Sequence, residues 1–186
     1  MGVFVRVLRQ QVWFLEAEVG IGQAYTQVDT RVRLDNTSFL RAVHRVLSRL
    51  PSKPELFRLI YADTGITQPW GVPVFRTATQ TRVLRWRRYA QSPWEFLRAQ
   101  AMGPDTILID GRFRVACILE CLLNLGDRSD CVILVDDYMG RHEYAVVEHF
   151  ADRVVSAGEM ATLRKKPDFD RQECLRVLSH WQRDWR

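Results

Sequence analysis

The stretch from residue 106 to residue 138 constrains the fold more than any other part of the sequence. Two short apolar runs, Thr106–Ile109 and Cys131–Val135, flank a helix-length segment whose apolar residues recur at the spacing of a helical face. A strand, a helix and a second strand at this spacing form a βαβ unit with parallel strands and a right-handed crossover. The unit therefore predicts an α/β domain built on a parallel sheet.

Each of these apolar runs ends in acidic residues. Asp110 follows the first run, and Asp136 and Asp137 follow the second. The C-terminal ends of parallel neighbours lie side by side, and ligands of open α/β sheets bind at this edge. We therefore expect three carboxylates to converge at a functional site.

A second candidate site lies within the first 35 residues. An apolar run over residues 12–18 leads into Gly20 and Gly22, the layout of a nucleotide-binding loop in which backbone N–H groups approach a ligand. The third glycine of a dinucleotide fingerprint is missing, because Tyr25 occupies that position. Asp35 ends an expected strand over residues 31–35 and is placed to bind ribose hydroxyls, or else caps the following helix. The glycine pair can equally form a turn that binds nothing.

The rest of the chain continues the alternation of strands and helices. A third strand is expected over Phe57–Ala62, and Asp63 follows it directly. Helical spacing predicts helices over residues 37–50, 77–100, 141–151 and 170–186, and Ser92-Pro93 can begin a separate helix. Two short strands over residues 154–157 and 160–163 surround Gly158-Glu159, which is a hairpin signature.

Composition limits the class of protein. With 186 residues, 47% of them hydrophobic, the chain fits one globular domain over residues 1–186. Apolar runs of roughly 18–20 residues, as a membrane span needs, are missing from the sequence, and residues 1–19 do not show a signal-peptide pattern. The four cysteines include no CxxC pair, which predicts buried, reduced thiols and a cytoplasmic protein.

The net charge of +5 comes from local clusters of arginine. One cluster is the stripe Arg41, Arg45 and Arg49, and another spans Arg82 to Arg88. Such a face attracts nucleic acid or is simply a solvated helix surface. Because no nucleic-acid-binding motif accompanies the arginines, we do not expect nucleic acid as a partner, and the lack of long apolar runs argues against a membrane. The sequence does not indicate an oligomeric state.

The order of βα steps followed by a hairpin resembles the class I S-adenosylmethionine-dependent methyltransferase fold. The resemblance implies a single doubly wound, mostly parallel, Rossmann-like sheet with a C-terminal antiparallel hairpin and a terminal helix. It also implies that S-adenosylmethionine is the cofactor. The implied cofactor-binding residues are Glu18, Gly20 and Gly22 in the first motif, Asp35 at the ribose and Asp63 at the adenine.

More narrowly, the chain resembles an uncharacterised bacterial methyltransferase-like family. The stretches that carry this likeness are residues 61–65 with Trp70-Gly71, residues 110–115, and Asp136-Asp137-Tyr138 with Arg141.

The two acidic strand ends also resemble those of metal-dependent sugar O-methyltransferases of the macrolide-tailoring type. This likeness implies that Asp110, Asp136 and Asp137 hold Mg²⁺, which orients and acidifies two adjacent substrate hydroxyls. Those enzymes carry a further acid two positions after the first, which serves as the base, whereas this chain has Arg112 there. The alternative is that Arg112 or Arg114 pairs with the aspartates and neutralises them without a metal.

The function expected from these features is methyl transfer from S-adenosylmethionine to a hydroxyl of a small polar or sugar-like acceptor. Asp110, Arg112, Asp136 and Asp137 are the expected catalytic residues. The alternative is a binding or scaffold protein that has kept the fold and lost catalysis.

Overall fold

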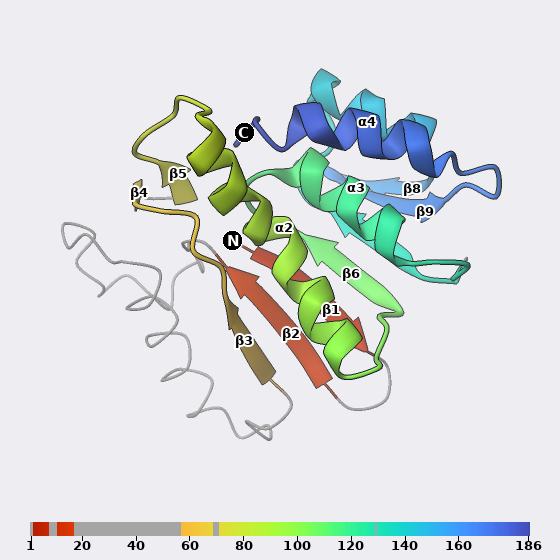
Figure 1. Cartoon of the computed structure of the whole chain (residues 1–186). Helices are drawn as coiled ribbons and strands as arrows, with labels where there is room; N and C mark the ends of the chain where they lie inside the picture. The colour runs from red at the N-terminus through yellow and green to blue at the C-terminus, as the bar shows by residue number, and fades with distance from the viewer. Residues whose placement is uncertain (1, 8–10, 17–56, 69–70, 129) are drawn as a thin grey trace.

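Seven strands form one mixed sheet in the order β3-β2-β1-β6-β7-β9-β8 (Figure 1). The computed structural model describes residues 2–7, 11–16, 57–68, 71–128 and 130–186. The strands of the sheet are β1 (Gly2–Val7), β2 (Gln11–Glu16), β3 (Phe57–Tyr61), β6 (Thr106–Ile109), β7 (Val132–Val135), β8 (Ala151–Ala157) and β9 (Met160–Lys165). A separate small sheet pairs β4 (Thr67–Gln68) with β5 (Val72–Pro73).

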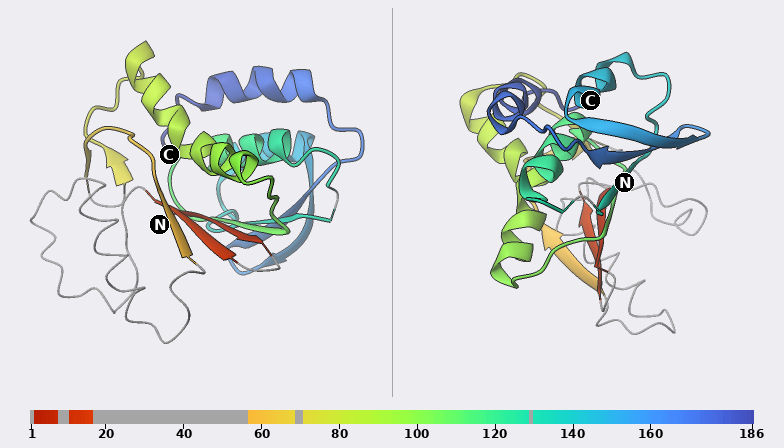
Figure 2. Two further views of the ribbon diagram at one scale, coloured as in Figure 1. Left: turned by 60° about the horizontal axis from the view of Figure 1, so that its bottom comes forward. Right: turned by 90° about the vertical axis from the view of Figure 1, so that its right-hand side faces the viewer.

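Three α-helices of the described residues lie on one face of this sheet (Figure 2). They are α2 (Gln80–Ala99), α3 (Arg114–Asn124) and α4 (Arg171–Trp181). A 3₁₀ helix, η3 (His142–His149), connects β7 to β8. The described helices therefore do not show the doubly wound arrangement that the resemblance implied.

The strand pairing confirms the central βαβ unit but corrects the rest of the sheet. Strands β6 and β7 are parallel, with Ile109 opposite Val135, and β2 and β3 are also parallel. The other four neighbouring pairs are antiparallel, so the expectation of a mostly parallel sheet is wrong. The additional strand β1 is one reason: only three residues separate it from β2, and so short a connection joins antiparallel strands.

The core lies between the sheet and α3. Ile107, Ile109, Ile133 and Val135 are fully buried, and they alternate with less buried residues along β6 and β7. Helix α3 is buried along its length because it contacts both α2 and α4 as well as β6. The four cysteines are free and buried, which confirms the prediction of buried thiols.

Several expected elements differ in extent or lie outside the described residues. Helix α2 continues through Pro93 instead of beginning there, and the helix expected over residues 141–151 is the 3₁₀ helix η3. The strand expected over residues 31–35 and the helix over residues 37–50 lie outside the described residues. Within the part of the chain that the structure describes, no helix combines the length and apolarity required to cross a membrane.

Candidate functional site

The ends of β6 and β7 bring two acidic segments to one edge of the sheet. Asp110 follows Ile109 directly, and the backbone N–H of Asp136 donates a 3.0 Å hydrogen bond to the carbonyl of Ile109. Parallel pairing of β6 and β7 therefore places Asp110, Asp136 and Asp137 at the same edge, as the sequence predicted.

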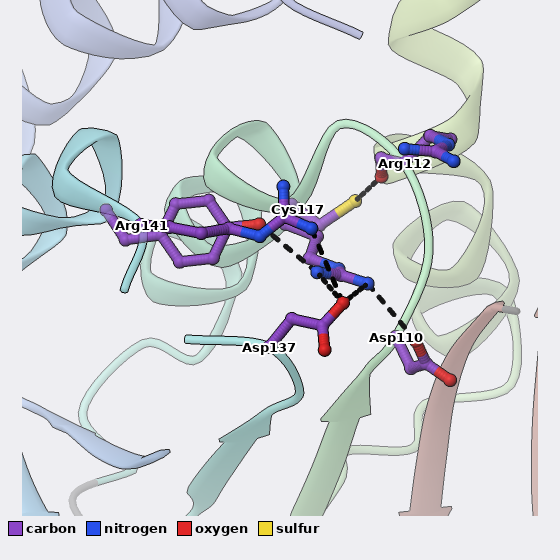
Figure 3. Close-up of polar contacts among 7 residues, drawn as sticks. Asp110, Arg112, Cys117, Asp137 and Arg141 are labelled. Atoms are coloured by element: carbon purple, nitrogen blue, oxygen red, sulfur yellow. Dashed lines mark hydrogen bonds and ion pairs between the residues drawn. The ribbon is translucent and has the colours of Figure 1, made fainter. Parts of the chain in front are cut away.

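A buried arginine joins two of these aspartates, Asp110 and Asp137, which are labelled in Figure 3. Arg114 is the first residue of α3 and is only 3% exposed. Its Nη1 lies 3.1 Å from Asp137 Oδ2, and its Nη2 lies 3.3 Å from Asp110 Oδ1. The hydroxyl of Tyr144 lies 3.4 Å from the same Nη1. Arg114 therefore bridges the ends of both strands and the helix η3.

Arg141 adds a second positive charge to the cluster. Its Nη2 lies 3.4 Å from Asp137 Oδ2, and its guanidinium lies 5.7 Å from the centre of the Tyr144 ring. Because Asp137 Oδ2 accepts hydrogen bonds from both Arg114 and Arg141, this carboxylate is the centre of the network. The sequence offered one signal for these pairs, the spacing of four residues from Asp110 to Arg114 and from Asp137 to Arg141.

Arg112 does not take part in this pairing. Figure 3 shows its side chain directed away from Asp110 and Asp137. Its carbonyl accepts a 3.7 Å contact from the thiol of Cys117. Burial lowers the pKa of Arg112, and the nearby positive charges of Arg114 and Arg141 lower it further. Of the two arginines proposed from the sequence as partners of the aspartates, the structure selects Arg114.

The carboxyl of Asp110 has a perturbed pKa. Burial raises its pKa above the ordinary value, and the negative charge of Asp136 raises it further, while Arg114 opposes both effects. An acid with a raised pKa at a ligand-binding edge is suited to accept a proton near neutral pH. Tyr144 also has a raised pKa because it is buried, so it stays a neutral hydroxyl beside Arg114.

The backbone at this edge adopts an uncommon conformation. Asp137 and Phe113 have φ values of 50° and 55°, in the left-handed region that residues other than glycine rarely occupy. The Phe113 ring lies 5.7 Å from the rings of both Trp86 and Tyr89, and this packing holds the turn before α3. Strained backbone of this kind is common where side chains must be aimed at a site.

The structure does not support the expected Mg²⁺ site. Among the described residues, no group of three or more His, Cys, Asp or Glu side chains is placed to hold a metal ion. Asp110 and Asp137 instead face the Arg114 guanidinium, a cation that takes the place of a metal charge between them. These residues therefore do not fit a magnesium site in this arrangement.

The expected cofactor-binding residues are divided between two parts of the chain. Glu18, Gly20, Gly22 and Asp35 lie outside the described residues. Asp63 follows β3, where it accepts a 3.0 Å hydrogen bond from the N–H of Gly65 and lies 3.9 Å from Arg85. Two strands, β2 and β1, separate β3 from β6, so Asp63 and Asp110 belong to different parts of the sheet edge.

Comparisons with known proteins support the fold. No protein-family model and no curated protein matches the chain. The crystal structure of a methyltransferase-like protein from Silicibacter pomeroyi DSS-3 is similar to this chain, with a TM-score of 0.66 and 24% sequence identity. The match covers 80% of this chain and 73% of that protein's chain. This likeness confirms the resemblance predicted from the sequence at the level of architecture: the chain has a methyltransferase-like fold.

Proposed function

We propose that this protein is an S-adenosylmethionine-dependent methyltransferase that modifies a hydroxyl of a small polar or sugar-like acceptor. The methyltransferase-like fold supports the reaction class. The observation that carries the proposal is the Asp110 carboxyl, whose pKa is raised and which lies at the sheet edge where α/β proteins bind ligands.

The chemistry requires a proton acceptor and a positioned acceptor oxygen. When bound, S-adenosylmethionine would supply an electrophilic methyl group to the acceptor oxygen and would leave as a neutral thioether. The hydroxyl proton passes to the Asp110 carboxylate. Burial and Asp136 make this carboxylate more basic, and Arg114 holds its Oδ1 at 3.3 Å. Positioning of this kind supplies much of the rate in a transfer between two bound molecules.

The first test is calorimetric titration with S-adenosylhomocysteine, followed by transfer of labelled methyl groups to a panel of sugars and polyols. We expect saturable binding and labelling of at least one hydroxyl compound. Asp110→Asn keeps an oxygen for Arg114 but loses the base, so turnover should fall by about 10²-fold or more while binding of S-adenosylhomocysteine is retained. Asp127→Asn, an exposed residue beyond the end of α3, is the matched control. Absence of both binding and transfer would overturn the proposal.

A second candidate function has its own support. Because Arg114 already ties Asp110 to Asp137, the acidic edge is stable without any ligand. Strand β1 also separates β2, which precedes the expected glycine loop, from β6 by about 10 Å. Both observations favour a binding protein that keeps the fold without catalysis. The same titration separates the two functions, because this second function predicts no heat with S-adenosylhomocysteine.

A further inference from the structure

A pocket between helices α2, α3 and α4 lies apart from the acidic edge. Its volume is about 480 Å³, within the range of small-molecule sites. The residues that define this three-helix pocket are Arg87, Gln91, Arg98, Glu120, Arg171 and Gln182. Glu120 lies six residues after Arg114 in α3, which corresponds to about 9 Å along the helix axis.

Two residues that line this pocket carry buried polar atoms without a partner. Gln182 is 6% exposed, and its Oε1 accepts no hydrogen bond from the residues that the structure describes. Within the same part of the chain, the buried Nε of Arg87 donates none. Buried polar groups in folded proteins are nearly always paired, so a group outside the described residues is expected to complete them. Gln182 Oε1 needs a hydrogen-bond donor, and Arg87 Nε needs an acceptor.

Charge and hydrogen bonds in the pocket are arranged around a buried acid. Glu120 is 6% exposed and accepts hydrogen bonds from Gln91 Nε2 at 2.9 Å and Asn124 Nδ2 at 3.3 Å. Burial raises the pKa of Glu120, against the effects of these amides and of Arg98 and Arg87.

Two further arginines stand at the rim of the pocket and are held in place by α3. Arg98 Nη1 donates to Asn124 Oδ1 at 2.5 Å, and Arg171 Nη1 donates to the carbonyl of Leu123 at 2.8 Å. Three arginines and two acids, Glu95 and Glu120, therefore line the pocket. This excess of positive charge favours an anionic ligand.

We propose that the three-helix pocket binds a small organic anion that also carries hydroxyl groups. The anionic group accepts from Arg87 Nε and from the rim arginines, while a hydroxyl donates to Gln182 Oε1. An anion without hydroxyl groups, such as sulfate, does not satisfy this arrangement, since it brings no donor to Gln182. The anionic group can be a phosphate or a carboxylate, because arginine binds both.

The test is calorimetric titration of the full chain with glycerol 3-phosphate and with glycerate. We expect saturable binding of at least one, and the stronger of the two identifies the anionic group. Sulfate, which has no O–H donor at neutral pH, and glycerol, which has no anionic group, should each bind at least about tenfold more weakly. S-adenosylhomocysteine should not compete, so failure of this proposal is distinguishable from failure of the proposed function.

Four variants connect the binding to these residues. Arg87→Gln and Gln182→Leu should each weaken the affinity roughly tenfold. Arg88→Gln in α2 and Gln172→Leu in α4, both at exposed positions, should leave it unchanged. Thermal unfolding without ligand establishes that each variant is folded, and Gln182→Leu alone decides if Arg87→Gln fails to fold.

Three results would overturn the proposal. The first is no saturable binding of either organic anion, which would mean that water completes the two polar atoms. The second is sulfate binding as tightly as the stronger of the two organic anions, which would reduce the pocket to a nonspecific cationic surface. The third is equal affinity in the pocket variants and in their controls.

Discussion

Replacement of Arg114 by methionine tests whether the buried guanidinium holds the acidic edge together. Methionine fills similar space with an unbranched apolar chain, so the main loss is the contacts to Asp110, Asp137 and Tyr144. The side chain of Arg114 is 4% exposed, whereas those of Asp110 and Asp137 are 22% and 44% exposed. The variant therefore leaves one largely buried carboxylate and one half-exposed carboxylate without their partner.

The expected magnitude follows from this difference in burial. Removing one member of a fully buried ion pair costs about 3–5 kcal/mol, and breaking an exposed pair costs about 0–1 kcal/mol. Because Asp137 can regain water, we expect Arg114→Met to lower the free energy of unfolding by about 2–4 kcal/mol. For a chain of 186 residues, this corresponds to a fall in Tm of about 5–15 °C.

Urea unfolding followed by circular dichroism measures this loss, and two further variants assign its cause. Arg141→Met breaks a pair with the same Asp137, but the Arg141 side chain is 33% exposed, so it should cost less than about 1 kcal/mol. Combining Arg114→Met with Asp110→Asn removes the unpaired buried charge and should recover about 1 kcal/mol. The reasoning is refuted if Arg114→Met stays within about 0.5 kcal/mol of the wild type, or if Arg141→Met costs as much.

Three further predictions concern single groups. The pKa of Asp110 is raised, so the carboxyl binds its proton more tightly in the folded state than in the unfolded state. The free energy of unfolding of the wild type should therefore fall relative to that of Asp110→Asn as the pH rises from about 4. Urea titrations at several pH values check this. Burial raises the pKa of Cys131 and of Cys174 to about 12, so all four cysteines should react with a thiol reagent only after unfolding. Phe113→Ala should cost about 3–5 kcal/mol in thermal unfolding, since its ring packs on Trp86 and Tyr89.

The central unit could be predicted from sequence because its signals are local. Thr106–Ile109 and residues 131–135 are short apolar runs of strand length, and the segment between them has helical spacing. Their order and separation leave few topologies, so the parallel pairing and the shared acidic edge followed directly. The antiparallel position of β1 did not follow, because it depends on pairing with β6, more than 90 residues away in the chain.

The choice between Arg112 and Arg114 could not be made from spacing alone. Both arginines follow Asp110 closely, and either has the length to reach it. The structure decides through the turn at Phe113, whose left-handed conformation precedes the first residue of α3. Side chains at the start of a helix point back toward its N-terminus, so Arg114 is aimed at the ends of β6 and β7. Arg112 lies before the turn and is directed elsewhere (Figure 3).

The Arg114 guanidinium lies where a metal ion would lie between Asp110 and Asp137, and this difference changes the chemistry that the acidic edge favours. A divalent cation between Asp110 and Asp137 would lower the basicity of both carboxylates strongly and would bind the acceptor oxygens directly. A guanidinium carries half that charge, and its N–H groups donate to the aspartates themselves. The pKa of Asp110 accordingly stays above its ordinary value despite the ion pair, because burial and Asp136 outweigh Arg114. Such an edge is better suited to removing a proton from a hydroxyl than to polarising it, which is the role that we propose for Asp110.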